Sequence, residues 1–162
     1  MSFKCVKRIP PIPKNEKQRM LWSEAAKEAE LRLHLGECMT DEQAIRRLVL
    51  WQQWAEPDET AHIFLADRKG FFLKRFCIYG NGVRMRESYV CYLKSEISNL
   101  EAAYFFAVHN HADKNTDPSP DDILLTAAIE SLTKWLLSGN TEFLGHYITN
   151  GFKVIKIDSV LG

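Results

Sequence analysis

Two histidines and one aspartate in this chain have the side chains and the spacing of a metal site. His109 and His111 directly follow the apolar run 102–108, and Asp122 comes eleven residues after His111, at the start of an apolar helical pattern. Because a strand alternates its side chains with period two, both histidines leave it on the same side. Two imidazoles and one carboxylate leave the fourth position of a zinc ion for water, which is the arrangement of catalytic rather than structural zinc sites. The pattern therefore predicts a Zn²⁺ site that hydrolyses a substrate.

The surrounding pattern predicts the elements that must carry these residues. Apolar positions at helical spacing predict helices over 15–35, 40–56, 87–102 and 119–137. Period-two runs predict strands over 60–66, 71–79, 103–108, 143–149 and 152–157, the last two joined as a hairpin around Asn150-Gly151. This order predicts an α/β sandwich with a mixed central sheet, flanked by helices and preceded by two N-terminal helices.

Two of the helix starts are indicated by capping residues. Thr40 is the expected N-cap of the helix over 40–56, with Gln43 three residues later completing a capping box. Ser119 is the expected N-cap of the helix over 119–137. A cap at this position places Asp122 in the first turn, where the helix dipole favours an acidic side chain.

Length and charge limit the class of protein. A chain of 162 residues fits one domain with a single core, and 21 basic against 21 acidic side chains argue against a protein that coats nucleic acid along its whole surface. The charge is uneven, however, because residues 1–19 carry six lysines and arginines against Glu16 alone. We expect a basic, proline-containing arm over 1–19, a helical region over 20–56 and a catalytic domain over 57–162. The arm is expected to be a disordered tail, with binding to nucleic acid or to an acidic partner as the alternative.

Cysteine use and hydropathy indicate the compartment. The four cysteines are widely scattered without a C-x-x-C pair, which favours buried thiols in an intracellular chain over disulfides. Neither the apolar segment of a secretory signal nor a long apolar span is found. We expect a cytoplasmic protein without a membrane partner, and the oligomeric state is left open.

The metal motif resembles that of a known protein family. His109-x-His111 followed by Ser119-x-x-Asp122 matches the H-x-H-x7-S-x-x-D signature of the JAMM metalloproteases, which have the JAB/MPN fold. The His-Asn-His tripeptide 109–111 and the Pro-Ser pair 118–119 are most similar to the RadC-like branch of that family. The resemblance extends over about two-thirds of the chain, residues 57–162.

The resemblance implies a cytidine-deaminase-like sandwich that binds Zn²⁺ through His109, His111 and Asp122. It implies that Ser119 supports the metal site and helps to stabilise the oxyanion, and that Glu59, which opens the first strand, is the general base. It also implies hydrolysis of a peptide or isopeptide bond in a peptide or protein-conjugate substrate. The alternative is a non-catalytic binding module with the same fold in a DNA-repair or mobile-element setting.

One loop departs from the family pattern. Family members normally continue after the second histidine with Pro-Ser-Gly-Asp, where this chain has Ala112-Asp113-Lys114-Asn115. The spacing of the ligands is kept, so the departure concerns the loop that frames the cleft rather than metal binding. The substrate class is therefore not carried over from the family.

Other acidic and histidine side chains have simpler expected roles. Glu87 is the rival general base, but Arg86 and Glu87 are expected to form a structural pair at a helix start. His146 is expected to be a strand histidine near the site rather than a fourth ligand, and Asp113 and Asp117 to be solvated loop acids.

Overall fold

The computed structural model describes residues 15–18, 20, 21, 24, 27, 28, 31, 36, 38–52, 59–79, 87–137 and 139–159. Its elements, in chain order, are α2 (Glu42–Gln52), β1 (Thr60–Ala66), β2 (Phe72–Tyr79), α3 (Glu87–Asn99), β3 (Tyr104–His109), α4 (Pro120–Leu136), β4 (Glu142–Thr149) and β5 (Val154–Ile157). From residue 42 onward this is the order that the sequence predicts. The described positions between 16 and 31 are helical. The remaining positions of 16–35, in the first predicted helix, and residues 53–56 of the second predicted helix lie outside the described residues. No helix in the described part of the chain has both the length and the apolar composition that a membrane crossing requires.

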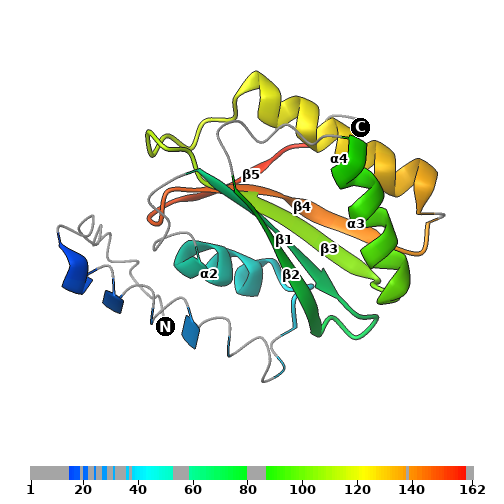
Figure 1. Ribbon diagram of the computed structural model, residues 1–162, viewed down its shortest axis with the longest axis horizontal. Coiled ribbons are helices and arrows are strands. Elements are labelled where there is room, and N and C mark those ends of the chain that lie inside the picture. The colour runs from blue at the N-terminus through cyan, green and yellow to red at the C-terminus, as the bar shows by residue number, and fades with distance from the viewer. Residues whose placement is uncertain are drawn as a thin grey trace, which may run out of the picture.

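The strands form one five-stranded sheet in the order β2-β1-β3-β4-β5 (Figure 1). β3 and β4 run parallel, and the other three neighbouring pairs are antiparallel. Parallel strands need a crossover, which α4 provides, whereas β4 and β5 are joined by a short hairpin loop. The predicted mixed α/β fold with a mixed central sheet is therefore confirmed.

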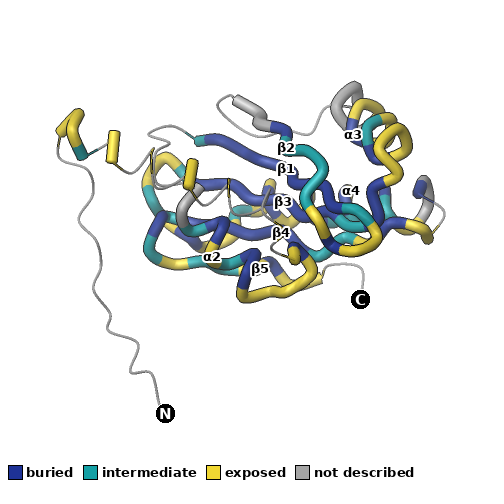
Figure 2. The backbone as a smooth tube through the Cα atoms, turned by 90° about the horizontal axis from the view of Figure 1, so that it is seen from below, coloured by how far each residue is buried: buried dark blue, intermediate teal, exposed yellow. Residues whose placement is uncertain are grey.

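Helices cover both faces of the sheet (Figure 1). α3 and α4 lie against one face, the α4 face, over a core cluster that includes Ile63, Leu65, Phe105, Ala107, Leu125 and Ile129. α2 lies against the opposite face, the α2 face, over a second cluster that includes Ile45, Leu48, Val49, Phe64, Phe106, Val108 and Tyr147. Figure 2 shows the central strands buried between these helices.

Strand alternation directs the first histidine toward α4. Phe105 and Ala107 of β3 lie on the α4 face, whereas Phe106 and Val108 lie on the α2 face. His109 ends β3 and continues the first of these series, so its side chain faces α4. β1 beside it is buried at every position, as expected for an interior strand with helices on both sides.

A β-bulge interrupts the alternation in β4. Phe105 pairs with Phe143, but the next residue of β3, Phe106, pairs with Gly145, so Leu144 is an extra residue in β4. Gly145 has a φ of 140°, a backbone conformation that residues with a Cβ rarely adopt. Glycine therefore allows the bulge at this point.

The bulge decides which side chains at the end of β4 lie on the α4 face of the sheet. Phe143 packs on the α4 face, and uninterrupted alternation would turn Tyr147 to that face as well and His146 away from it. Instead Tyr147 belongs to the α2-face cluster, and His146 hydrogen-bonds to Thr126 of α4. The bulge therefore brings His146 to the same side of the sheet as His109.

The expectation that Thr40 caps α2 in a capping box with Gln43 is wrong. The Asp41 carboxylate accepts hydrogen bonds from the backbone N–H groups of Gln43 and Ala44, both at 3.2 Å. The Thr40 hydroxyl instead lies 2.9 Å from Cys38 Sγ. A carboxylate offers two oxygens and can satisfy two of the free N–H groups at a helix start, which one hydroxyl oxygen does less well.

Candidate metal centre

Three side chains converge at the carboxyl end of β3. His109 ends β3, His111 lies two residues beyond it, and Asp122 is in the first turn of α4. His109 Nε2 lies 2.9 Å from Asp122 Oδ1 and 2.9 Å from His111 Nε2, and His111 Nε2 lies 3.1 Å from Asp122 Oδ2. The structure therefore brings the three ligands predicted from the sequence together.

The chemistry of this group fits a metal ion. One ligand atom of each residue lies within 4.8 Å of the others, and His109 and Asp122 are buried while His111 is half-buried. Imidazole nitrogens and carboxylate oxygens this close together need positive charge between them, from a shared proton or from a cation. Ligand atoms about 2.0 Å from a tetrahedral ion lie about 3.3 Å from one another, so the group would need to open only slightly. The three side chains can therefore hold a metal ion.

Ser119 ties the Asp122 carboxylate to the start of α4. Its backbone N–H and its hydroxyl both donate to Asp122 Oδ2 at 2.7 Å, and its Oγ accepts from the Asp122 N–H at 3.2 Å. These bonds form a capping box, so the predicted N-cap is confirmed. Burial alone would raise the pKa of Asp122, but the contacts with His109 and the hydrogen bonds from Ser119 outweigh it and lower that pKa below its usual range. The carboxylate is therefore ionised at neutral pH.

A pocket of about 530 Å³ opens beside the ligand group. Its lining residues are Glu59, His111, Ala112, Asp113, Asn115, Asp117, Pro118, Ser119, Asp121 and Asp122. Glu59 directly precedes β1 and is half-buried, and it shares this pocket with His111 and with Ser119. The structure therefore places the predicted base, the predicted hydroxyl donor and two of the predicted ligands around one space.

The pocket is acidic. Among its described lining residues there is no lysine or arginine, and five carry carboxylates: Glu59, Asp113, Asp117, Asp121 and Asp122. Asp113 and Asp117 are exposed, as expected of loop acids. A pocket of this charge attracts cations and repels phosphate groups.

Asn110, between the two histidines, holds the chain next to the predicted base. Its side-chain oxygen accepts hydrogen bonds from the Thr60 backbone N–H and hydroxyl at 2.9 and 3.0 Å, and the backbone N–H of Asn110 donates to the Thr60 carbonyl oxygen at 3.3 Å. Asn110 is 1% exposed, so these bonds are shielded from water. Because Thr60 follows Glu59, Asn110 connects the position of the predicted base to that of the predicted ligands. Spacing alone assigns Asn110 no such role, and the only signal in the sequence is a polar residue enclosed between two ligands.

The loop after His111 contains a left-handed residue. Lys114 stands where the family pattern has glycine, and its φ of 62° lies in the region that favours glycine. Its N–H donates to His111 O at 3.0 Å, and Asn150 Nδ2 donates to Lys114 O at 3.1 Å. The backbone here thus adopts, with a lysine, a conformation that suits the glycine of the family pattern.

Replacing Lys114 by glycine is expected to raise the free energy of unfolding by about 0.5–1 kcal/mol, because glycine adopts this conformation without the cost of a Cβ. The Lys114→Ala variant loses the same amine but keeps a Cβ, and no such gain is expected. Urea titration followed by circular dichroism measures both variants. An equal gain in the alanine variant would show that charge, rather than backbone conformation, is the cause.

His146 lies behind His109 rather than in the ligand group. Its Nε2 is 2.8 Å from His109 Nδ1, and its Nδ1 is 2.8 Å from Thr126 Oγ1. Both ring nitrogens are therefore engaged, which agrees with the expectation of a strand histidine near the site rather than a fourth ligand. Burial first, and the neighbouring His109 second, lowers the pKa of His146 to about 3. The imidazole is therefore neutral at physiological pH.

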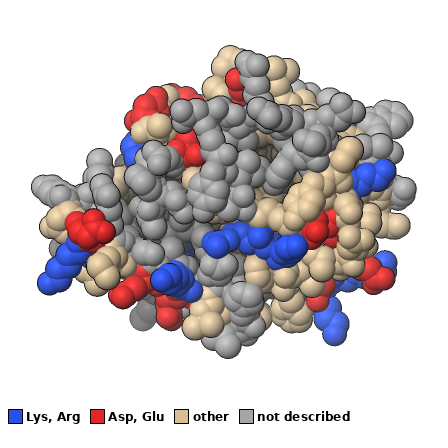
Figure 3. Space-filling model, viewed as in Figure 1, with Lys and Arg blue, Asp and Glu red and all other residues tan. Residues whose placement is uncertain are grey.

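Two predicted features lie outside the described residues. The side chains of Arg86 and Glu87 are not among those described, so the structural pair and the rival base stay predictions. The basic arm is described only at residues 15–18, so its binding to nucleic acid also stays a prediction. On the face seen in Figure 3, basic and acidic side chains are interspersed, and the described residues form no continuous basic surface there.

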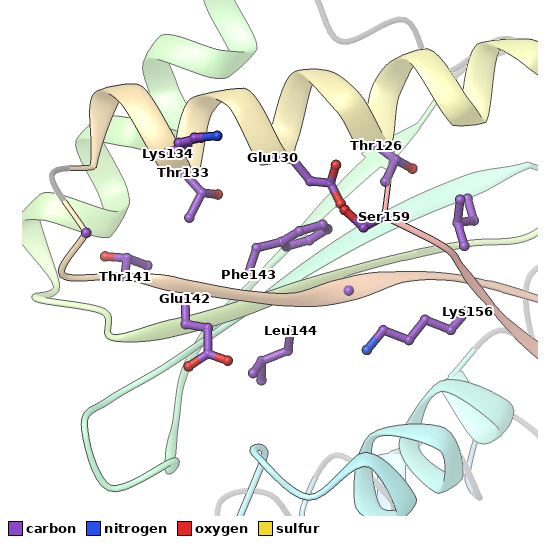
Figure 4. A pocket seen from close by; sticks show the side chains of 13 residues that line it. Thr126, Glu130, Thr133, Lys134, Thr141, Glu142, Phe143, Leu144, Lys156 and Ser159 are labelled. Atoms are coloured by element: carbon purple, nitrogen blue, oxygen red, sulfur yellow. The ribbon is translucent and has the colours of Figure 1, made fainter. Parts of the chain in front are cut away.

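A second hollow lies between α4 and the carboxyl-terminal strands (Figure 4). Its volume is about 590 Å³, and its lining includes charges of both signs, from Glu130, Lys134, Glu142 and Lys156. None of the three ligand residues lines it. Thr126, which contacts His146, borders this hollow on the α4 side.

Comparison with known proteins agrees with this geometry. The family described as "RadC-like JAB domain" matches residues 39–155, which include α2, the first four strands and the three ligand residues. A search of curated proteins found no match. The match thus covers most of the chain and includes α2, which packs against the sheet.

Proposed function

The chain belongs to the RadC-like JAB domain family, and we propose that it is a zinc-dependent metallohydrolase that cleaves a peptide or isopeptide bond. The observation that carries the proposal is the convergence of His109, His111 and Asp122 beside an acidic pocket that Glu59 also lines. Two imidazoles and a carboxylate that converge, with a further acidic side chain in the adjoining pocket, are the parts that metal-assisted hydrolysis requires.

Each residue of the site has its own proposed task. His109, His111 and Asp122 would hold the ion, which would lower the pKa of a water molecule so that the water is nucleophilic near pH 7. Glu59 accepts a proton from the attacking water and passes it to the leaving amine. The Ser119 hydroxyl, which donates to Asp122 in this structure, orients that carboxylate and can turn to donate to the oxyanion of the tetrahedral intermediate.

The charge of the pocket supports an amide rather than a phosphodiester as the scissile bond. Five carboxylates line the pocket, and a nucleic acid would bring further negative charge into it with every phosphate. An amide bond is neutral, and lysine or arginine residues around it would be attracted by the same carboxylates. We therefore propose a substrate that is basic near the scissile bond.

The proposed type of sandwich, the domain bounds and the location rest on family membership and on the sequence. We propose that the two helical layers and the sheet form a cytidine-deaminase-like sandwich. Residues 57–162 would be the catalytic unit, 20–56 the helical region and 1–19 the basic arm. A cytoplasmic location is proposed with them.

The second candidate is a non-catalytic binding module in a DNA-repair or mobile-element setting. The observation that favours it is the arm over 1–19, with six basic residues against one acidic residue. Binding of DNA through this arm would weaken with salt and would be indifferent to the Asp122→Ala substitution.

The two candidates are distinguished by assaying zinc-loaded and chelated protein on lysine-containing peptides, isopeptide-linked conjugates and duplex DNA. We expect the loaded protein to cleave an amide substrate, chelation to abolish the cleavage and added Zn²⁺ to restore it. A fully loaded protein that cleaves no amide, together with DNA binding that Asp122→Ala leaves unchanged, would favour the binding module.

A further inference from the structure

A buried chain of hydrogen bonds connects α4 to the ligand His109. Thr126 Oγ1 donates to Asp122 O at 2.7 Å and lies 2.8 Å from His146 Nδ1, and His146 Nε2 lies 2.8 Å from His109 Nδ1. Thr126, His146 and His109 are each 1% exposed, so water does not compete for these bonds. These hydrogen bonds connect three elements, α4, β4 and β3.

The Thr126 hydroxyl determines which atom donates and which accepts in each of these hydrogen bonds. A hydroxyl has one hydrogen, and that of Thr126 is donated to the Asp122 carbonyl oxygen, so toward His146 the hydroxyl must accept. His146 Nδ1 therefore carries a hydrogen. With the single ring hydrogen of this tautomer on Nδ1, the other nitrogen of His146, Nε2, is an acceptor, and it lies 2.8 Å from His109 Nδ1.

The consequence for His109 is a fixed role for each of its nitrogens. Because His146 Nε2 accepts, His109 Nδ1 must donate and carries a hydrogen. The other nitrogen, Nε2, is the one that faces Asp122 and His111. His109 therefore reaches the ligand group with Nε2 directed at the place where an ion would bind.

We propose that His146 and Thr126 are positioning residues that hold the His109 ring in its orientation and reserve its Nε2 for the metal ion. The proposal rests on the metal site of the proposed function but not on hydrolysis. The chain of bonds ends on the backbone of Asp122, so it also ties one ligand to another. Partners of this kind typically change metal affinity about 10–100-fold when they are removed.

Two matched pairs of variants separate hydrogen bonding from packing. Thr126→Val removes the hydroxyl at nearly constant shape, whereas Thr126→Ser keeps it. His146→Phe removes both ring nitrogens, whereas His146→Gln keeps an acceptor oxygen near His109 Nδ1. Competition with a chromophoric chelator measures zinc affinity, and thermal unfolding of the chelated proteins shows that each variant is folded.

We expect His146→Phe to weaken zinc binding about 10–100-fold and Thr126→Val to weaken it toward the lower end of that range. The affinities of Thr126→Ser and His146→Gln should stay close to that of the unaltered protein. This order across the four variants is expected only if hydrogen bonding, rather than packing, is what the two residues contribute.

Nitrogen-15 NMR of the histidine rings measures the hydrogen on His109 Nδ1 directly, and a residue with a purely structural role would leave this signal unchanged. In the chelated, unaltered protein we expect a hydrogen on His109 Nδ1, protected from exchange with water. Zinc should change the chemical shift of His109 Nε2 while the Nδ1 hydrogen persists. In Thr126→Val and His146→Phe this hydrogen should exchange faster.

The possible outcomes distinguish the positioning role from the proposed function. Unchanged zinc affinity and unchanged His109 N–H exchange in both Thr126→Val and His146→Phe would overturn the positioning role and leave the proposed hydrolase standing. A His109 Nδ1 without hydrogen in the unaltered protein would also overturn it. Failure of the unaltered protein to bind zinc would overturn the metal site of the proposed function, and the positioning role with it.

Discussion

Replacing Asp122 by alanine is expected to lower zinc affinity by about two to three orders of magnitude and to abolish hydrolysis. The carboxylate lies within 3.1 Å of both histidine nitrogens, so alanine removes the anionic ligand of the group. Structural zinc sites bind with about 10–16 kcal/mol, or about 2.5–4 kcal/mol for each of four ligands, which gives this magnitude. Loss of the capping box with Ser119 should also lower the free energy of unfolding by about 1 kcal/mol.

Asp121→Ala is the matched control for this substitution. Asp121 is the neighbouring residue of the same helical turn and lines the same pocket, but it is exposed and is not part of the ligand group. Elemental analysis should find about one zinc per chain in Asp121→Ala and almost none in Asp122→Ala. Equal metal content in the two variants would contradict the assignment of Asp122 as a ligand.

Replacing Glu59 by glutamine is expected to reduce kcat by about 10²–10⁴-fold while the zinc affinity stays unchanged. Glutamine has nearly the shape of glutamate but cannot take a proton from water at neutral pH. Glu59 lines the pocket beside His111 and Ser119 and is not part of the ligand group. The metal should therefore stay in place while proton transfer to the leaving amine fails.

Asp117→Asn makes the matched change on another wall of the pocket. Asp117 is an exposed lining residue, so its neutralisation removes one negative charge without removing the proposed base. A small effect on kcat is expected, with any loss appearing in KM for a basic substrate. Equal rates for Glu59→Gln and the unaltered protein, both fully loaded with zinc, would end the assignment of Glu59 as the base.

The ligand group could be predicted from the sequence because local geometry determines most of it. His109 and His111 are two residues apart at a strand end, and their side follows from the strand period. Ser119 and Asp122 belong to one capping box, so a single local motif positions the hydroxyl and the carboxylate together. Neither inference needs to know which strands are neighbours in the sheet.

The contacts of the supporting residues could not be predicted, because strand pairing determines them. Asn110 reaches Thr60 because β3 pairs with β1, and hydropathy patterns do not tell which strands are neighbours. His146 reaches His109 because β4 lies on the other side of β3 and contains a bulge. The sequence pattern therefore indicates the ligands but not the bonds that hold them.

The missed N-cap of α2 has a different cause. Thr40 and Asp41 are adjacent, and both residue types are good caps. The choice between them depends on where the backbone enters the helix, which places the Asp41 carboxylate within reach of two N–H groups. A one-residue error of this kind is inherent in reading helix boundaries from residue types.

The glycine in β4 contributes to the candidate metal centre although it has no functional group. Leu144 is an extra residue in the pairing of β4 with β3, and the bulge at Gly145 accommodates it before β4 reaches His146. Without the bulge, every side chain of β4 after Leu144 would lie on the opposite face of the sheet. The phenol of Tyr147 would then lie on the α4 face, where the imidazole of His146 now lies behind His109.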